Sequence, residues 1–249
     1  MAWVTKSSTE EYAAPEPPKQ YTPKQKAGNW WHYHKVIVVV AVLLVIALTW
    51  TLYDIFGRPQ ADYHVGWVGA ADLPADTVSA LEEQLAAFGR DLNGDGRVLV
   101  TVDQFPYDFS ADTQADPTYQ MAIYTRLEGD LALSDGCYIF LLQDPEGFQQ
   151  MTGALQYTDG TLPPDASTDW QRMVYRWGDC PVLAGLDLGE YTGLTTVDDI
   201  TGSSQELLAN VYIGRRGNWQ QENEYYAACD AMWDALTAGA AALPADSAE

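Results

Sequence analysis

The sequence predicts an α/β protein with a single transmembrane helix followed by one α/β sandwich domain that has a mostly parallel sheet. The first observation is an uncharged apolar run from Val36 to Tyr53. Eighteen residues are about the minimum for a helix that crosses a hydrocarbon core. The second observation is that segments with strand periodicity and helix periodicity alternate after this run, which is typical of strand–helix–strand units.

The charges around the apolar run predict its orientation. All five lysines of the chain precede it, and only Arg58 is basic just after it. The positive-inside bias then places the N-terminus in the cytoplasm and the rest of the chain outside the cell membrane. A cleaved signal peptide is the alternative, but no clear A-x-A cleavage site follows the run. We expect a disordered cytoplasmic tail (1–34), a single-pass signal anchor (35–56), an extracytoplasmic α/β domain (62–237) and a disordered C-terminal tail (238–249).

The part of the chain beyond Asp54 is strongly acidic. Of 13 basic residues, five lysines lie in the tail and eight arginines remain; of 35 acidic residues, four lie at or before Asp54 and 31 remain, so the net charge is −23. Such a field repels nucleic acid and attracts cations, so we expect no nucleic-acid partner. High charge also keeps an exported domain soluble. Arg215 and Arg216 form a concentrated basic site that either pairs with acids or holds a carboxylate ligand.

The first half of the domain shows a strand–helix–strand pattern. Residues 63–69 are predicted to be a strand. Asp72 and Pro74 are typical of a helix start. The glycines and polar residues of 93–96 end this helix, and alternating valines after it predict a second strand. The buried face of the helix is predicted from apolar residues at spacings of three and four: Val78, Leu81, Leu85, Phe88 and Leu92.

The second half continues the alternation. The apolar run 137–142 is typical of a strand that is covered on both faces. The other expected elements are helices over about 119–128, 144–151 and 222–236, and strands within 181–188 and 207–213.

Three cysteines lie in the domain and allow at most one internal disulfide. A Cys180–Cys229 bridge is one alternative. Cys137 and Cys229 fall on apolar faces, where a thiol behaves as a small buried hydrophobe. A catalytic thiol needs a base, and His64 is the single histidine of the domain.

The segment 91–97 resembles the first half of a calcium-binding loop. Asp91, Asn93 and Asp95 supply oxygens at the first, third and fifth positions, and a glycine follows at the sixth. The backbone carbonyl of Arg97 is the next expected ligand. The twelfth position is Val102, where a bidentate glutamate is expected. Calcium is therefore a candidate cofactor, and a helix stop followed by a turn is the alternative interpretation.

Aromatic residues in loop-like stretches form a second candidate site. Trp67, Tyr107 and Trp170 could stack a sugar or hold a cationic ligand, with Asp108 as a nearby carboxylate. The alternative is that these rings are core or loop anchors.

The middle of the chain resembles a known family. The matching stretches are Leu127-Glu128-Gly129-Asp130, the run from Asp135 to Phe140, Gly153-Ala154-Leu155 and Gly160-Thr161-Leu162-Pro163. They resemble extracellular solute-binding proteins, which have the type II periplasmic-binding-protein fold, and the likeness covers about half of the domain. It implies a periplasmic-binding-protein-like fold and a solute-binding role. The chain has room for one lobe, so it looks like a short, one-lobed, anchored relative. The segment from Trp30 to Lys35 is similar to membrane-anchored proteins of Gram-positive bacteria, which implies location alone.

Three functions follow as hypotheses. The first is a membrane-tethered solute-binding module without catalytic activity that binds a small molecule such as a sugar or peptide. The second is a domain that docks on another membrane protein. The third is a carboxylate-dependent hydrolase. No P-loop, G-x-S-x-G or H-E-x-x-H motif is present, so the sequence favours binding over catalysis.

Overall fold

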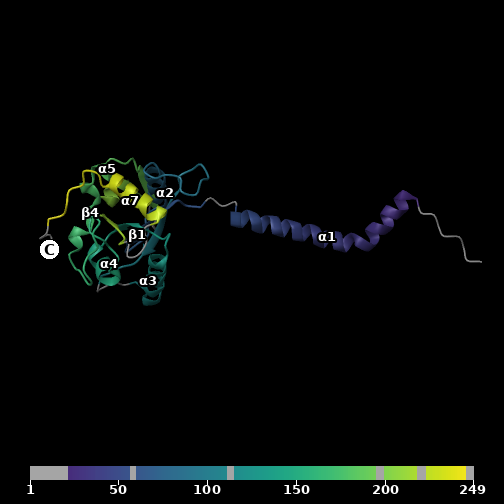
Figure 1. The fold of residues 1–249 in the computed structure, drawn as a ribbon, viewed down its shortest axis with the longest axis horizontal. Coiled ribbons are helices and arrows are strands. Elements are labelled where there is room, and N and C mark those ends of the chain that lie inside the picture. The colour runs from purple at the N-terminus through teal and green to yellow at the C-terminus, as the bar shows by residue number, and fades with distance from the viewer. Residues whose placement is uncertain (1–21, 57–59, 111–114, 195–198, 218–222, 245–249) are drawn as a thin grey trace, which may run out of the picture. The chain divides into compact units, whose positions relative to one another are not determined.

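A computed structural model describes residues 22–56, 60–110, 115–194, 199–217 and 223–244. The chain divides into two compact units, Met1–Arg58 and Pro59–Glu249. The first contains α1 (Pro23–Phe56), which is long and apolar enough to cross a membrane (Figure 1). Residues 23–34 were expected to be disordered, but they are helical. A helix already nucleated by the apolar run extends at little cost through Gln25, Lys26 and Ala27, which are good helix formers.

A five-stranded sheet forms the centre of the second unit. Its strand order is β2-β1-β3-β7-β4. β1 pairs in parallel with β2 and β3, whereas β7 pairs antiparallel with β3 and β4. The bounds are Tyr63–Gly69 (β1), Val100–Pro106 (β2), Ile139–Leu142 (β3), Val174–Arg176 (β4) and Tyr212–Arg215 (β7).

Because β7 runs opposite to its neighbours, the expectation of a mostly parallel sheet is not confirmed. Trp177, directly after β4, donates its backbone N–H to the carbonyl of Val211, directly before β7, at 2.7 Å. β7 therefore starts at the edge where β4 ends and must run back along it. The sheet is mixed, and the α/β class is confirmed.

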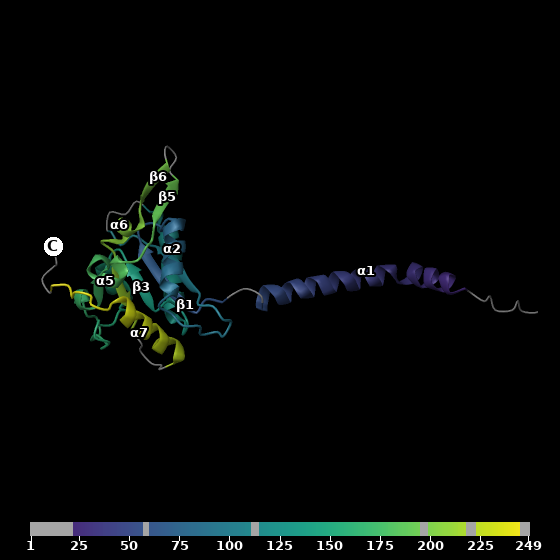
Figure 2. The same ribbon diagram turned by 90° about the horizontal axis from the view of Figure 1, so that it is seen from above.

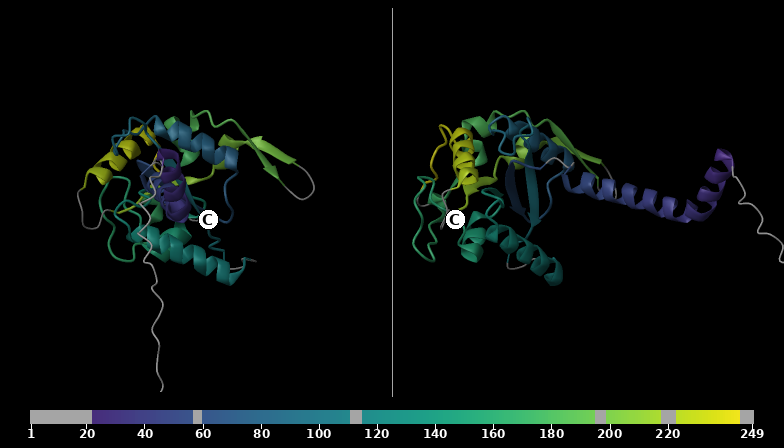
Figure 3. Two further views of the ribbon diagram at one scale, coloured as in Figure 1. Left: turned by 90° about the vertical axis from the view of Figure 1, so that its right-hand side faces the viewer. Right: turned by 45° about the vertical axis from the view of Figure 1, so that its right-hand side comes forward.

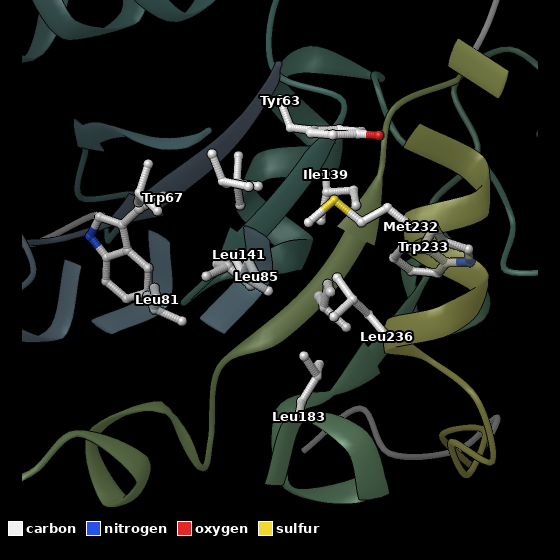
Figure 4. Packing of buried hydrophobic residues seen from close by; sticks show 14 of the residues in the cluster. Tyr63, Trp67, Leu81, Leu85, Ile139, Leu141, Leu183, Met232, Trp233 and Leu236 are labelled. Atoms are coloured by element: carbon white, nitrogen blue, oxygen red, sulfur yellow. The ribbon is translucent and has the colours of Figure 1, made fainter. Parts of the chain in front are cut away.

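One face of the sheet is covered by helices from both ends of the domain. α2 (Ala75–Ala86) buries Leu81 and Leu85 there, and α7 (Glu224–Leu236) buries Met232, Trp233 and Leu236. Figure 4 shows these side chains gathered around Tyr63 and Trp67 of β1 and Ile139 and Leu141 of β3. The predicted spacing thus identifies Leu81 and Leu85 on the buried face of α2. The helix ends at Ala86 and does not run to the glycines of 93–96 as expected, so Phe88 and Leu92 pack on the cluster from beyond its end.

The opposite face carries α3 (Pro117–Ala132) and α4 (Pro145–Thr152), as Figure 1 shows. Ile123 and Leu127 of α3 and Phe148 of α4 pack there against alternate strand residues, including Val68 and Phe140. The domain therefore has three layers, with the sheet between two sets of helices.

Both helices on this second face have capped N-termini. The Asp116 carboxylate accepts the N–H of Thr118 at 2.7 Å, and Pro117 occupies the first turn of α3. The Asp144 carboxylate accepts the N–H of Gly147 at 2.9 Å, and Pro145 begins α4. These caps satisfy N–H groups that have no partner inside the helix. They define where each helix begins after its strand.

Other elements differ from the expectation. The predicted strand within 181–188 is replaced by the short helix α5 (Pro181–Ala184), because Pro181 at the first helical position favours a turn of helix. Residue 207 belongs to α6 (Ser204–Leu208) rather than to a strand. β4 and the hairpin of β5 (Glu190–Leu194) and β6 (Asp199–Ser203) were not predicted. Figures 2 and 3 show this hairpin standing out from the other elements of the domain.

The segment 238–244 was expected to belong to a disordered tail, but it packs on the domain. Ala241 donates its backbone N–H to the carbonyl of Asp179 at 3.1 Å. Ala240 and Leu243 contact the two hydrophobic clusters. The free energy gained by burying these apolar side chains outweighs the conformational entropy that a frayed end would keep. Residues 245–249 lie outside the described residues.

A buried carboxylate ties the start of β1 to the connection between α2 and β2. Asp62 is 4% exposed. One of its oxygens accepts the N–H groups of Leu92 at 2.7 Å and Asn93 at 3.1 Å, and the other accepts the N–H of Leu99 at 2.8 Å. These three hydrogen bonds hold the 91–97 loop against the domain.

Replacing Asp62 by Ala is expected to lower the free energy of unfolding by about 3 kcal/mol, because three N–H groups lose a charged acceptor. Urea unfolding of the full chain in detergent micelles, followed by tryptophan fluorescence, measures the change. The exposed Asp72 provides the control, and Asp72→Ala should change the free energy by less than about 0.5 kcal/mol. Equal stabilities of the Asp62→Ala variant and the parent chain would contradict the role assigned to this carboxylate.

Candidate ligand-binding site

A cavity of about 710 Å³ opens beside the end of β2, between the segment 107–110, α3 and α4. β2 runs directly into this segment, and β3 leads through Asp144 into α4. The two strands run parallel on either side of β1, so their carboxyl ends meet at the same edge of the sheet. Ligands bind at this edge in open α/β sheets. The lining side chains include Tyr107, Asp108, Phe109, Gln120, Tyr124 and Gln150.

Aromatic rings form much of the cavity wall. The ring centroid of Tyr107 lies 4.8 Å from that of Phe109 and 6.4 Å from that of Tyr124. Gln120, which is 8% exposed, holds the segment in place because its side-chain oxygen accepts the N–H of Asp108 at 3.0 Å. Gly147 lets α4 approach Phe109 closely. A Cβ at this position would lie 2.6 Å from the Cβ of Phe109, which is too short for two carbon atoms.

Two of the four predicted ligand-binding residues lie in this cavity. Tyr107 and Asp108 line it. Trp67 does not, because it points to the opposite face of the sheet, is 5% exposed and donates its indole N–H to the carbonyl of Ala71 at 2.8 Å. Trp170 begins the 3₁₀ turn Trp170–Arg172 and packs edge-on against Tyr212, with centroids 5.7 Å apart. The cavity therefore brings together Tyr107 and Asp108 but neither tryptophan, and ligand binding by Trp67 and Trp170 stays a prediction.

The helix residues of the site were missed by the sequence analysis. Gln120 and Tyr124 are four residues apart on α3, and Gln150 lies on α4. The signal was present: polar and aromatic residues four apart share one face of a helix. The helix predicted over 119–128 was assigned no functional residues.

The segment 91–97 forms a compact turn. The Asp91 carboxylate accepts the N–H groups of Gly94 at 2.6 Å and Gly96 at 2.8 Å. Asn93 and Asp95 each accept the N–H two residues ahead, at 2.9 Å. The N–H of Gly96 is the main cause that lowers the pKa of Asp91.

The hydrogen bonds show the turn itself, but they do not test whether it binds calcium. Gly94 and Gly96 have φ values of 77° and 84°, a region that favours glycine. Among the described residues, no three His, Cys, Asp or Glu side chains are grouped so that they could hold a metal ion. Ligation by Asp91, Asn93, Asp95 and the Arg97 carbonyl stays a prediction, and the turn interpretation accounts for the observed hydrogen bonds.

A second polar cluster lies near the amino end of β1. The Nδ1 of His64 donates to the Asp103 carboxylate at 2.7 Å, and the Sγ of Cys137 lies 3.7 Å from the same oxygen. The hydrogen bond to Asp103 raises the pKa of His64 above its ordinary value of 6.5. Burial raises the pKa of the Cys137 thiol strongly, and the charges of Asp130 and Asp103 add to this effect. The thiol stays protonated, so the cluster provides no thiolate nucleophile.

The remaining sequence candidates serve the fold. Cys137, Cys180 and Cys229 are all free and buried, so no Cys180–Cys229 disulfide forms. Arg215 donates to the Asp230 carboxylate at 2.8 Å and lies with its guanidinium carbon 5.2 Å from the centre of the Trp233 ring. Its side chain is 8% exposed, which favours the interpretation as a partner of acids.

Comparison with family models, with curated proteins and with solved structures found no match to this chain. The geometry of the domain is therefore the basis for assigning a function. Aromatic rings, a carboxylate and side-chain amides come together in the cavity at the carboxyl edge.

The His64–Asp103 pair predicts a pH dependence of stability. The folded pKa of His64 lies above the unfolded value, so its contribution is complete below about pH 6.5 and is lost as the pH rises through the folded pKa. Between pH 5.5 and 8.5 the full chain should therefore lose more stability than a His64→Gln variant. Urea midpoints at the two pH values measure this difference. The same loss in both proteins would mean that the pair contributes nothing.

Proposed function

We propose that this protein is a membrane-anchored, extracytoplasmic module that binds a small solute. The resemblance to extracellular solute-binding proteins suggests this role, and a one-lobed, periplasmic-binding-protein-like domain is part of the same proposal. The module has no catalytic task in this account. The observation that carries the proposal is the aromatic cavity at the carboxyl edge of β2 and β3.

The cavity has the properties of a small-molecule site. Its volume of about 710 Å³ falls in the range of such sites, about 300–1,000 Å³. Its walls combine the rings of Tyr107, Phe109 and Tyr124 with a few polar groups. Apolar walls supply affinity, and the polar groups orient the ligand. Both helices that form the walls begin at capped N-termini, so the lining residues stand on rigid supports.

The N-terminal unit supports the proposed location. α1 meets the length and composition of a membrane span. The lysines that precede its apolar run favour a cytoplasmic N-terminus, which would expose the acidic domain outside the membrane. Anchoring would keep a captured solute close to the membrane surface.

Ligand binding should raise the melting temperature of the full chain in micelles of an uncharged polyoxyethylene detergent, because a ligand that binds only the folded state stabilises it. The probes are single compounds: glucose, glucosamine, alanine, dialanine and 1,5-diaminopentane. We expect at least one to raise the melting temperature. A Ser110→Trp variant, which places a ring at the mouth of the cavity, should abolish that shift.

Glu83→Trp is the matched control, because Glu83 is exposed on α2 at the opposite face of the sheet. Its shift should equal that of the parent chain. An equal loss in both tryptophan variants, or no shift with any probe from a well-folded sample, would overturn the proposal.

Docking on another membrane protein is the second candidate. The β5–β6 hairpin favours it, because these two strands form a separate two-stranded sheet (Figure 2). Strand edges of this kind can accept a strand from a partner. A well-folded chain that binds none of the solutes would shift the preference to this role.

A further inference from the structure

Three aromatic rings give the cavity negative electrostatic faces. Tyr107 lies between Phe109 and Tyr124, and its ring is tilted by 57° and 52° to theirs. The face of an aromatic ring attracts a cation placed within about 6 Å of its centre. A ligand in the cavity lies beside these three contacting rings.

Several polar groups of the cavity offer hydrogen-bond acceptors, and the side-chain nitrogen of Gln120 adds a donor. The Tyr124 hydroxyl donates its proton to Glu128, so its oxygen can only accept from a ligand. The same bond raises the pKa of Tyr124. The side-chain nitrogen of Gln150 donates to Glu146 at 3.0 Å, and its oxygen is an acceptor. Asp108 adds a carboxylate to the lining, and one of its oxygens also accepts the N–H of Ser110 at 3.0 Å.

The charge distribution around the cavity has one sign. No Lys, Arg or His is among the described residues that line it. Arg126, two residues after Tyr124, lies 4.8 Å above the ring of Phe105 and does not line the cavity. Glu128 and Glu146 accept hydrogen bonds from the lining side chains Tyr124 and Gln150. The domain has no lysine, and its negative field raises the local concentration of cations.

We propose that the cavity takes an organic cation with a primary ammonium group on a compact body. The inference rests on the proposed function, and it specifies the ligand class. An ammonium group supplies three N–H donors for the acceptors of Tyr124, Gln150 and Asp108, and its charge suits the ring faces. A neutral solute of the same size uses only some of these features, and an anion meets only like charge.

Matched pairs of compounds test the ligand class. Glucosamine is compared with glucose, and 1,5-diaminopentane with 1,5-pentanediol, by calorimetric titration of the full chain in polyoxyethylene micelles at pH 6.5. Each pair differs chiefly in the ammonium group. We expect at least one amine to bind about tenfold or more tightly than its neutral counterpart, as a charged hydrogen bond predicts.

Variants test the location. Asp108→Asn keeps the shape and an acceptor oxygen but removes the charge, so it should weaken amine binding about tenfold. Glu83→Gln removes one charge from α2 on the opposite face and should leave the affinity within about twofold. Tyr124→Phe removes an acceptor and should also weaken binding. Circular dichroism and the melting temperature establish that each variant is folded.

The outcomes separate the two proposals. If glucose or pentanediol binds as tightly as its amine and Ser110→Trp removes that binding, the cation inference is wrong and the proposed function stands. If Glu83→Gln weakens amine binding as much as Asp108→Asn, the general field attracts the amine and the inference is also wrong. If no compound of either pair, nor alanine or dialanine, binds the folded chain, both proposals fail.

Discussion

The parallel pairing of β2, β1 and β3 is the constraint on which the candidate site depends. In a parallel arrangement all carboxyl ends meet at one edge. The segment after β2 and the helix after β3 are therefore neighbours, although about 40 residues separate them in sequence. α3 must return from the end of β2 to the start of β3 across the same face. The cavity is the space left between these three segments at the edge.

Alternation along the strands divides the domain chemically. Residues at odd positions of β1 and β3 form the larger apolar cluster with α2 and α7, whereas residues at even positions face α3 and α4. The cavity lies on the α3–α4 side, where fewer large side chains are buried. Under the proposed function, binding and the main core lie on different faces of the sheet, so the lining residues can vary without loss of that core.

Much of the fold was predictable because its signals are local. The apolar run of α1, the heptad-like spacing of α2 and the strands β1 and β3 follow from periodicity or length. β4 has only three residues, and β5 and β6 carry Gly193 and Gly202, so neither shows a strand pattern. β7 is antiparallel because the chain before it reaches the sheet at the edge where β4 ends. No local sequence pattern contains that information.

The site was only half predictable for a related reason. Tyr107 and Asp108 come directly after a strand, so their place at a sheet edge follows from the sequence. Trp67 is aromatic as well, but successive residues of a strand point to opposite faces of the sheet. Trp67 points to the face covered by α2 and α7, away from the cavity. Gln120 and Tyr124 line the cavity because of the way α3 is turned about its own axis. That rotation comes from the burial of Ile123 and Leu127.

The most direct test is methyl NMR of the full chain with labelled methionines in polyoxyethylene micelles. Met121 and Met151 line the cavity, whereas Met173 and Met232 are buried elsewhere, at 0% and 1% exposure. On titration with glucosamine or 1,5-diaminopentane, the signals of Met121 and Met151 should shift and saturate while those of Met173 and Met232 stay in place. Unchanged signals from Met121 and Met151, or shifts confined to Met173 and Met232, would contradict the assignment of the cavity as a binding site for an organic cation.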